Sequence, residues 1–187
     1  MAEIRTHSLI LTDGVVTLRP MTDGDFPLLF RWNGDEEVLH YSEGDVDPYT
    51  AEEVKSLYQP LSRKADCFIL ETEDGTPIGE CRLQSMPSPF PLPLRNSTDC
   101  RRVDIVIGEK EYWGKEYGSR SIGLLCRHVF ERTSCSHLFA CGILDYNERC
   151  RKAFEKNGFK VYSTVPADGD DYPGQITMFK GNINKIF

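Results

Sequence analysis

The spacing of apolar residues along the chain predicts an alternation of strands and helices. Period-two alternation between turn residues is typical of half-buried strands, and apolar residues at helical spacing behind an N-cap are typical of amphipathic helices. In chain order these patterns predict a strand at Val15–Arg19, helices at Phe26–Trp32 and from Thr50 to about Pro60, strands at Cys67–Thr72, Pro77–Gln84 and Arg102–Ile107, a helix at Ser119–Arg132, a strand at His137–Ile143, a helix at Asn147–Asn157, and strands at Phe159–Thr164 and Gln175–Lys180.

Capping and turn residues support the ends of these elements. Thr50 and Glu53 have the spacing of a capping box, which opens a helix. Asp74-Gly75 between two apolar runs predicts a hairpin turn. Gly158 follows the last predicted helix in the position where a left-handed residue ends helices.

Two connections stand out by composition. Asn33–Asp45 is acidic and rich in turn residues, and we interpret it as a solvated loop, with a substrate-facing patch as the alternative. Prolines at positions 87, 89, 91 and 93 predict an extended loop, for which a lid on the substrate side is our hypothesis. Strands joined by both hairpins and helical crossovers indicate an α/β (α+β) domain on a mixed sheet.

Composition narrows the class of protein. With 187 residues, 40% of them hydrophobic, the chain can bury one core, so we expect a single domain over residues 1–187. It has no run of 18 apolar residues and no signal-peptide pattern, so we expect a cytoplasmic protein without a membrane partner. The net charge of −7 argues against nucleic acid and suits a cationic small molecule.

Cysteine and histidine patterns exclude two kinds of site. The seven cysteines are scattered and form no CxxC pair, so we interpret them as buried free thiols rather than metal ligands or disulfides. The four histidines have no metal-binding spacing, and we predict no metal. No cysteine or serine shows a nucleophile–base pattern, which favours direct group transfer over an acyl-enzyme.

The segment from Arg102 to Arg120 carries the strongest chemical signal. An apolar strand with one carboxylate, Asp104, turns through Gly114 and Gly118 into an amphipathic helix. The first-turn N–H groups of a helix have no partner inside it, and the helix dipole favours negative charge there. This segment therefore predicts an anion site, and a phosphate ligand in particular.

Two landmarks in this half of the chain resemble a known family. Trp113–Gly118 is similar to the phosphate loop Gln/Arg-x-x-Gly-x-Gly/Ala of the GNAT N-acetyltransferases, with Glu116 in place of the first glycine of that pattern. Asn147–Phe159 is similar to the family's Asn-containing helix that ends in Gly-Phe. The resemblance implies a GNAT fold, with a mostly antiparallel, twisted mixed sheet flanked by helices, and acetyl-CoA as co-substrate.

Within the family, the likeness is closest to the aminoglycoside 6′-N-acetyltransferases. Asp25–Leu28, Trp32 and Asp35–Leu39 are similar to their substrate-side helices, and Pro77-Ile78-Gly79 to their third strand. The resemblance implies a catalytic carboxylate at Asp104 and substrate contacts at Asp145, Trp32 and Tyr146. It implies coenzyme contacts at Ile105, Val106, Ile107, Trp113, Gly114, Lys115, Glu116, Tyr117, Gly118, Ser119, Asn147, Arg151 and Phe154.

The chemistry explains the interest in Asp104. A primary amine is mostly protonated at neutral pH, so a carboxylate beside it can bind the ammonium and help to remove its proton. Backbone N–H groups near Ile105–Ile107 are expected to hold the carbonyl oxygen. Other interpretations stay open: Asp104 pairing with Arg101 or Arg102, and Asp145 as a helix-cap residue.

Two positions depart from the family pattern. A carboxylate at Glu116 would repel a pyrophosphate unless its side chain points to solvent, and a residue with a Cβ there is expected to need negative φ. Lys115 and Arg120 are candidates to offset its charge. Phe154 stands where many members place a tyrosine that protonates sulfur. Three alternatives stay open: Tyr146 protonates the coenzyme thiolate, water does so, or the thiolate leaves without an acid.

The predicted function is transfer of acetyl from acetyl-CoA to a primary amine of a small polycationic acceptor, with an aminoglycoside 6′-amine as the leading acceptor. The first alternative is acetylation of a protein N-terminus, as in ribosomal-protein alanine acetyltransferases, or of a polyamine. The second is a non-catalytic domain that binds acyl-CoA. Either a monomer or a homodimer is compatible with the sequence.

Overall fold

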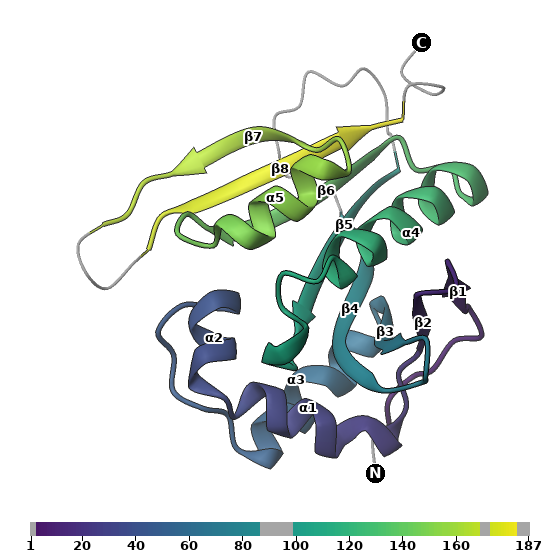
Figure 1. The fold of residues 1–187 in the computed structure, drawn as a ribbon, viewed down its shortest axis with the longest axis vertical. Helices are drawn as coiled ribbons and strands as arrows, with labels where there is room; N and C mark the ends of the chain where they lie inside the picture. The colour runs from purple at the N-terminus through teal and green to yellow at the C-terminus, as the bar shows by residue number, and fades with distance from the viewer. Residues whose placement is uncertain (1–2, 87–98, 169–172, 183–187) are drawn as a thin grey trace.

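In the computed structural model, which describes residues 3–86, 99–168 and 173–182, eight strands form one sheet in the order β1-β2-β3-β4-β5-β6-β8-β7 (Figure 1). The strands are β1 (Leu11–Thr12), β2 (Val16–Pro20), β3 (Ala65–Thr72), β4 (Pro77–Ser85), β5 (Cys100–Ile107), β6 (His137–Leu144), β7 (Lys160–Val165) and β8 (Gln175–Gly181). The helices are α1 (Phe26–Asn33), α2 (Glu36–Ser42), α3 (Ala51–Ser62), α4 (Tyr117–Arg132) and α5 (Glu148–Lys156), with short 3₁₀ turns at Asp23–Asp25 and Lys110–Tyr112.

Strand pairing is antiparallel everywhere except between β5 and β6. That one parallel ladder is short: Cys100–Arg102 faces His137–Phe139, and pairing ends there. β5 stays paired with β4 through Ile107, and β6 stays paired with β8 through Leu144. The two strands therefore diverge, and the sheet opens in its middle (Figure 1).

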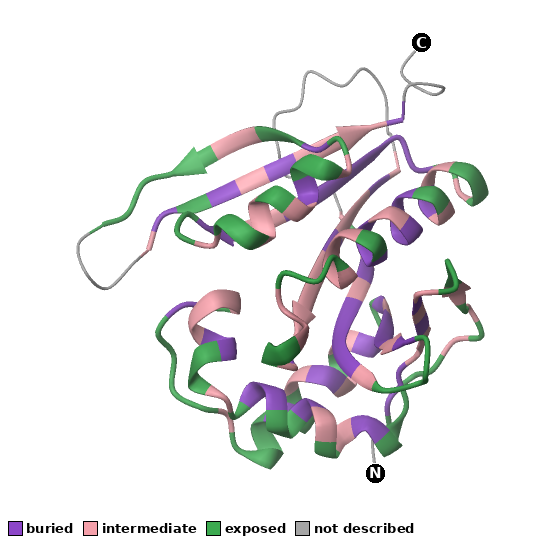
Figure 2. Cartoon of the chain, viewed as in Figure 1, coloured by how far each residue is buried: buried purple, intermediate pink, exposed green. Residues whose placement is uncertain are grey.

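Helices cover both faces of the sheet. Apolar residues of α4 and α5, such as Leu125 and Phe154, share one core with the inward-facing residues of β2–β6 and β8. A second core joins α1 and α3 to the opposite face through Leu29, Trp32, Tyr58 and others. Figure 2 shows the buried positions gathered on the central strands and on the inward faces of these helices. The two cores thus lie on opposite faces of the sheet, on either side of the point where the strands diverge.

Most predicted elements are present within a few residues of their predicted bounds, because capping and turn chemistry is local. The Thr50–Glu53 capping box opens α3. Gly75 has φ +83° in the β3–β4 hairpin, and Gly158 has φ +81° after α5, values that suit glycine.

Other expectations need correction. The acidic segment predicted as a loop contains α2, which Asp35 caps by accepting hydrogen bonds from the N–H groups of Glu37 and Val38. The edge strand β1 was not predicted, and α4 begins two residues earlier than expected, at Tyr117. The proline-rich loop, and with it the lid hypothesis, lies outside the described residues.

Candidate active site

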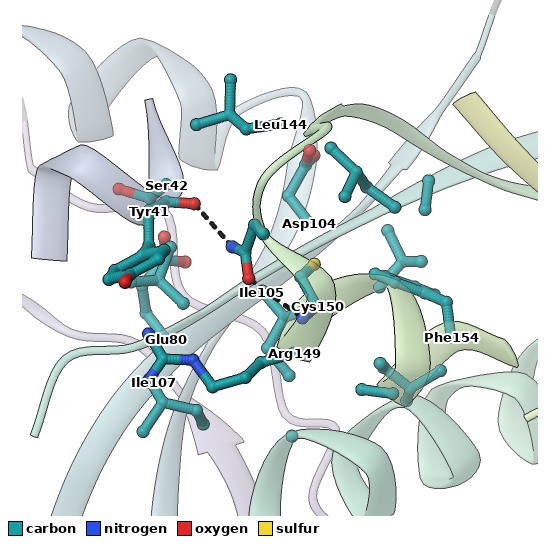
Figure 3. A pocket seen from close by; sticks show the side chains of 18 of the residues that line it. Tyr41, Ser42, Glu80, Asp104, Ile105, Ile107, Leu144, Arg149, Cys150 and Phe154 are labelled. Carbon is teal, nitrogen blue, oxygen red and sulfur yellow. Dashed lines mark hydrogen bonds between the residues drawn. The ribbon is translucent and has the colours of Figure 1, made fainter. Parts of the chain in front are cut away.

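A cavity of about 790 Å³ lies where β5 and β6 diverge. Strands and both layers of helices form its walls. One part comes from β5, β6 and α5, another from the loop before α4, and the rest from α1–α3 and β4. Figure 3 shows Glu80, Asp104 and Ile105 on the strands, with Arg149, Cys150 and Phe154 of α5 across from them. The cavity is large enough for a small-molecule ligand.

One wall is a row of alternating acids and bases. Arg82 on β4 is the register partner of Asp104 on β5, so their side chains share a face of the sheet with Glu80 and Arg102. Arg102 Nε donates to Asp104 Oδ1 at 2.8 Å, and Gln84 Nε2 donates to Oδ2 at 3.3 Å. Arg82 Nε lies 3.5 Å from Asp104 Oδ2. The pairing of Asp104 with Arg102 that the sequence left open is therefore present.

Glu80 is the residue that sequence reasoning missed. Its side chain is buried in the wall, with 2% of the residue exposed. Oε1 accepts from the Tyr58 hydroxyl at 3.3 Å and from Arg82 at 3.4 Å, whereas Oε2 has no hydrogen-bond partner within the described chain. Burial raises the pKa of this carboxyl group, against the lowering effect of Arg82. A carboxylate inside the apolar strand Pro77–Gln84 was a signal of the same kind that singled out Asp104.

Facing the acid–base wall, the loop before α4 presents backbone donors. Arg120 is the first residue of the helix whose N–H finds a helical partner, the Glu116 carbonyl at 2.9 Å. The N–H groups of Tyr117, Gly118 and Ser119 precede that ladder and are the orphan donors of the first turn. All three residues line the cavity. The loop is anchored by Trp113, whose indole N–H donates to the Ile107 carbonyl at 2.7 Å.

The backbone at Glu116 differs from the expectation. Its φ is +68°, so a residue with a Cβ occupies the left-handed conformation that the missing glycine of the pattern would favour. Its exposed carboxylate pairs with Lys156 of α5, whereas Arg120 is engaged by Asp13 at 2.9 Å. Lys115 lies over the Tyr112 ring. The charge of Glu116 is thus offset mainly by Lys156, with a smaller electrostatic contribution from Arg120.

The N-terminus of α5 connects the two sides of the cavity. Asn147 caps the helix by accepting from the Cys150 N–H, and its Nδ2 donates to the Tyr41 carbonyl at 2.7 Å. The guanidinium of Arg149 lies between Tyr41 and Trp113, at 4.3 Å and 4.1 Å from their ring centroids. Helix α2, the phosphate-loop segment and α5 are therefore coupled at one point.

The family model described as "Acetyltransferase (GNAT) domain" matches residues 16–160. The chain belongs to this family. The sheet order, the divergence of β5 and β6 and the loop before α4 are its observed framework, and the predicted fold class is confirmed.

Solved structures agree with this GNAT fold. AAC(6')-Ib in complex with ribostamycin and coenzyme A has a TM-score of 0.73 and 22% identity, covering 89% of this chain and 93% of that one. Spermidine N-acetyltransferase from Vibrio cholerae, in complex with CoA and spermine, has a TM-score of 0.73 and 17% identity, covering 93% and 99%. At these identities the likeness shows the fold alone.

A curated relative supplies no activity. It is an uncharacterized protein of Methanocaldococcus jannaschii, 27% identical over 150 residues, which are 79% of this chain. The GNAT chain spans only 28% of the length of that relative. A crystal structure of a domain from the same organism has a TM-score of 0.68 and 24% identity, covering 89% of this chain and 97% of that one.

Most residues predicted for the GNAT site line the cavity. They are Trp32, Asp104, Ile105, Val106, Ile107, Trp113, Gly114, Glu116, Tyr117, Gly118, Ser119, Asn147 and Phe154. The predicted contacts Lys115, Asp145, Tyr146 and Arg151 are not part of its described wall. Asp145 is exposed, and the Tyr146 hydroxyl donates to the His40 carbonyl at 2.7 Å, so no acid from these two reaches the cavity.

The remaining chemistry of the cavity is limited. Phe154 is buried against Phe159 and brings no proton donor. Cys150 also lines the cavity, and burial raises the pKa of its thiol to about 12, which keeps it neutral and a poor nucleophile. In the described residues, no three His, Cys, Asp or Glu side chains gather as a metal site. No described helix is long and apolar enough to cross a membrane.

Proposed function

We propose that the protein is an acetyl-CoA-dependent N-acetyltransferase acting on a primary amine of a small polycationic acceptor. One observation carries the proposal: a single cavity joins the first-turn N–H groups of α4 to a wall that bears Glu80 and Asp104. The donors suit a phosphate, and the carboxylates suit an ammonium group. An aminoglycoside 6′-amine is the leading acceptor, supported by the fold shared with AAC(6')-Ib.

The residues at the loop fit a coenzyme pyrophosphate. The N–H groups of Tyr117, Gly118 and Ser119 are free of the helical ladder, and an added Cβ at Gly118 would meet nothing nearer than 3.9 Å, so the backbone is open to a ligand. Basic side chains of α5, Arg149, Lys152 and Lys156, line the same side of the cavity. Acetyl-CoA would supply the thioester that is attacked.

The acceptor side lies between β5 and helices α1–α3. Asp104 is our candidate for the carboxylate that attracts the ammonium group and orients it toward the diverging strand. Backbone N–H groups of β5 near Ile105–Ile107 that face away from β4, beyond the end of the ladder with β6, would stabilise the developing charge on the carbonyl oxygen. Because Phe154 stands in the place of the family's tyrosine and the Cys150 thiol is neutral, we expect the acetyl group to pass directly to the amine and the coenzyme thiolate to leave without a side-chain acid.

An acceptor screen tests the proposed substrate class. Release of free coenzyme thiol is measured with kanamycin-type aminoglycosides, polyamines and peptides that start with alanine. We expect turnover with aminoglycosides above that with the other two. Turnover confined to peptides or to polyamines would replace the leading acceptor with the corresponding alternative, since both bring a primary amine to the same cavity.

A non-catalytic role makes the opposite prediction. If the domain only binds acyl-CoA, calorimetry would give coenzyme binding and no amine would be acetylated. Absence of coenzyme binding would overturn the assignment of the loop itself.

We also propose that residues 1–187 form one domain that works in the cytoplasm as a monomer or homodimer. Sedimentation of the purified chain would test the oligomeric state.

The Asp104→Asn variant tests the acid–base wall. We expect it to fold, because the amide keeps the shape of the side chain, and to lose at least about tenfold in kcat. Coenzyme affinity, measured by calorimetry, should not change, because the loop before α4 lies elsewhere in the cavity. Activity close to that of the unmodified protein would remove Asp104 from the mechanism.

A further inference from the structure

We propose that Glu80, and not Asp104, is the general base that takes the proton from the acceptor's ammonium group. This inference rests on the proposed function and names a further catalytic residue in the same cavity. It leaves Asp104 a positioning role, in which its charge orients the ammonium group and holds Arg82 and Arg102 in place.

The first step in the argument is the engagement of Asp104. Both of its oxygens already accept a hydrogen bond, from Arg102 at Oδ1 and from Gln84 at Oδ2, and Arg82 Nε forms an ion pair with Oδ2 at 3.5 Å. The oxygens of a carboxylate held between two guanidinium groups are occupied by their donors. Asp104 is therefore less open than Glu80 to a further contact with the acceptor.

The second step is the contrast with Glu80. Arg82 and Tyr58 both contact Oε1, which leaves Oε2 without a partner although the residue is 2% exposed and lines the cavity. A buried polar oxygen without a partner is costly in a folded protein and is retained where function uses it. Oε2 is thus an unpartnered proton acceptor within the wall of the cavity, where it has almost no exposed surface, and the acceptor reaches it through movement of the Glu80 side chain.

The surroundings of Glu80 raise the pKa of its carboxyl group, which makes it a stronger base than an exposed glutamate. Burial is the largest influence on its pKa and raises it. Charged and titratable groups face it from each neighbouring element: Arg82 on β4, Asp104 on β5, Tyr58 on α3, Cys67 on β3 and Glu43 after α2. Arg82 and the Tyr58 hydrogen bond lower the pKa, and Asp104 and Glu43 raise it. A base is most effective when its pKa lies near the working pH.

The proposed step balances as follows. Glu80 Oε2 takes one proton from R–NH₃⁺ and leaves R–NH₂, whose lone pair attacks the thioester carbonyl carbon. A C–N bond forms, the C–S bond breaks, and the nitrogen loses its second proton to the departing thiolate. The products are R–NH–CO–CH₃ and coenzyme thiol, and the proton on Glu80 returns to water.

The test compares pH profiles of kcat for Glu80→Gln and Asp104→Asn, with an acceptor that the unmodified protein acetylates. The unmodified protein should lose activity as pH falls through the pKa of Glu80. In Glu80→Gln, kcat should fall by about 10²–10⁴-fold and this acidic limb should disappear. In Asp104→Asn the limb should persist and move to lower pH, because a neighbour that raises the pKa of Glu80 has been neutralised.

Two further variants define the control and the positioning group. Glu71→Gln makes the same chemical change on β3, at a residue that pairs with Arg19 and does not line the cavity, and should leave kcat and its pH profile unchanged. Tyr58→Phe removes a hydrogen bond that lowers the pKa of Glu80, so its acidic limb should move to higher pH. Thermal melting and coenzyme calorimetry confirm that each variant folds and binds.

The outcomes separate this inference from the proposed function. An acidic limb that vanishes in Asp104→Asn and persists in Glu80→Gln would overturn the inference and return the role to Asp104. An active protein whose Glu80→Gln variant keeps its rate would overturn it as well. If the unmodified protein acetylates no amine, the proposed function fails first. A ¹³C NMR titration of the glutamate carboxyl groups then still tests whether the carboxyl group with a raised pKa is missing in Glu80→Gln.

Discussion

At the scale of single residues, Glu116 is the position where sequence and structure disagree most. The residue was expected to require negative φ, yet the loop adopts φ +68° there. The loop is held between the anchored Trp113 before it and the start of α4 after it, and Glu116 takes the conformation that the family pattern gives to glycine. The cost of a non-glycine residue in this region is about 1–2 kcal/mol.

Replacing Glu116 by glycine should therefore relieve strain. The pair with Lys156 is exposed to solvent and contributes little to stability, so Glu116→Gly should melt at the same temperature as the unmodified protein or higher. Coenzyme should bind more tightly, because a carboxylate beside the phosphate site is lost. Differential scanning calorimetry and coenzyme titration measure the two effects.

Glu116→Ala separates charge from conformation. It removes the carboxylate and keeps a Cβ at positive φ, so it should tighten coenzyme binding like the glycine variant but gain no stability from conformation. Weaker coenzyme binding in both variants would mean that the carboxylate itself assists the ligand, contrary to the repulsion argument.

At the scale of elements, the N-terminus of α5 does more than begin a helix. Its cap residue, Asn147, uses its oxygen on the helix and its amide on the Tyr41 carbonyl of α2. Periodicity and the resemblance both placed Asn147 at the start of a helix, but the link to α2 joins residues that are 106 positions apart in the chain. No local pattern contains that information.

Asn147→Ala should lose both contacts. A lost N-cap costs about 1 kcal/mol, and the freed α2 should weaken the cavity wall, so coenzyme affinity should fall together with stability. Thr50→Ala is the matched control, because Thr50 caps α3 through the N–H of Glu53 without lining the cavity. It should cost a similar amount in urea unfolding and leave coenzyme affinity unchanged. Equal effects of the two variants on affinity would contradict a special role for Asn147.

At the scale of the whole molecule, the decisive feature is that β5 and β6 pair over a few residues and then diverge. Both strands were predicted, and so was the helix between them. Their divergence depends on the partners that hold each strand away from the other: β4 along β5, and β8 along β6. The cavity forms at this point because β5 remains hydrogen-bonded to β4, and β6 to β8, after β5 and β6 have separated.

The junction of the helical layer with β5 is tightly packed at Gly108. A Cβ at this position would lie 2.2 Å from the Trp32 ring, and Trp32 is itself buried. Gly108→Ala should therefore push α1 from the sheet and cost about 1–3 kcal/mol in urea unfolding. Gly24→Ala is the control, since its Cβ would meet its nearest neighbour, Thr22 Oγ1, at 3.5 Å. Unchanged stability of Gly108→Ala would show that Trp32 moves freely.

The sequence by itself determined the elements that depend on neighbours in the chain. The capping box at Thr50, the Asp74-Gly75 turn and the strand–loop–helix around Gly114 all follow from hydrogen bonds and φ angles within a few residues. It also brought Asp104 forward, because a carboxylate in an apolar strand is a local anomaly. Helix α2 was not predicted, because its buried apolar residues, Val38 and Leu39, are too few to show a helical period.

Only the tertiary structure decided how the carboxylates divide their chemistry. Glu80 and Asp104 lie on different strands, and the antiparallel register of β4 and β5 sets Arg82 opposite Asp104. That register leaves Asp104 engaged by two arginines and Glu80 buried with a free oxygen. Ion pairing and burial are properties of the packed molecule, so the residue type alone could not tell which carboxylate is free to accept a proton.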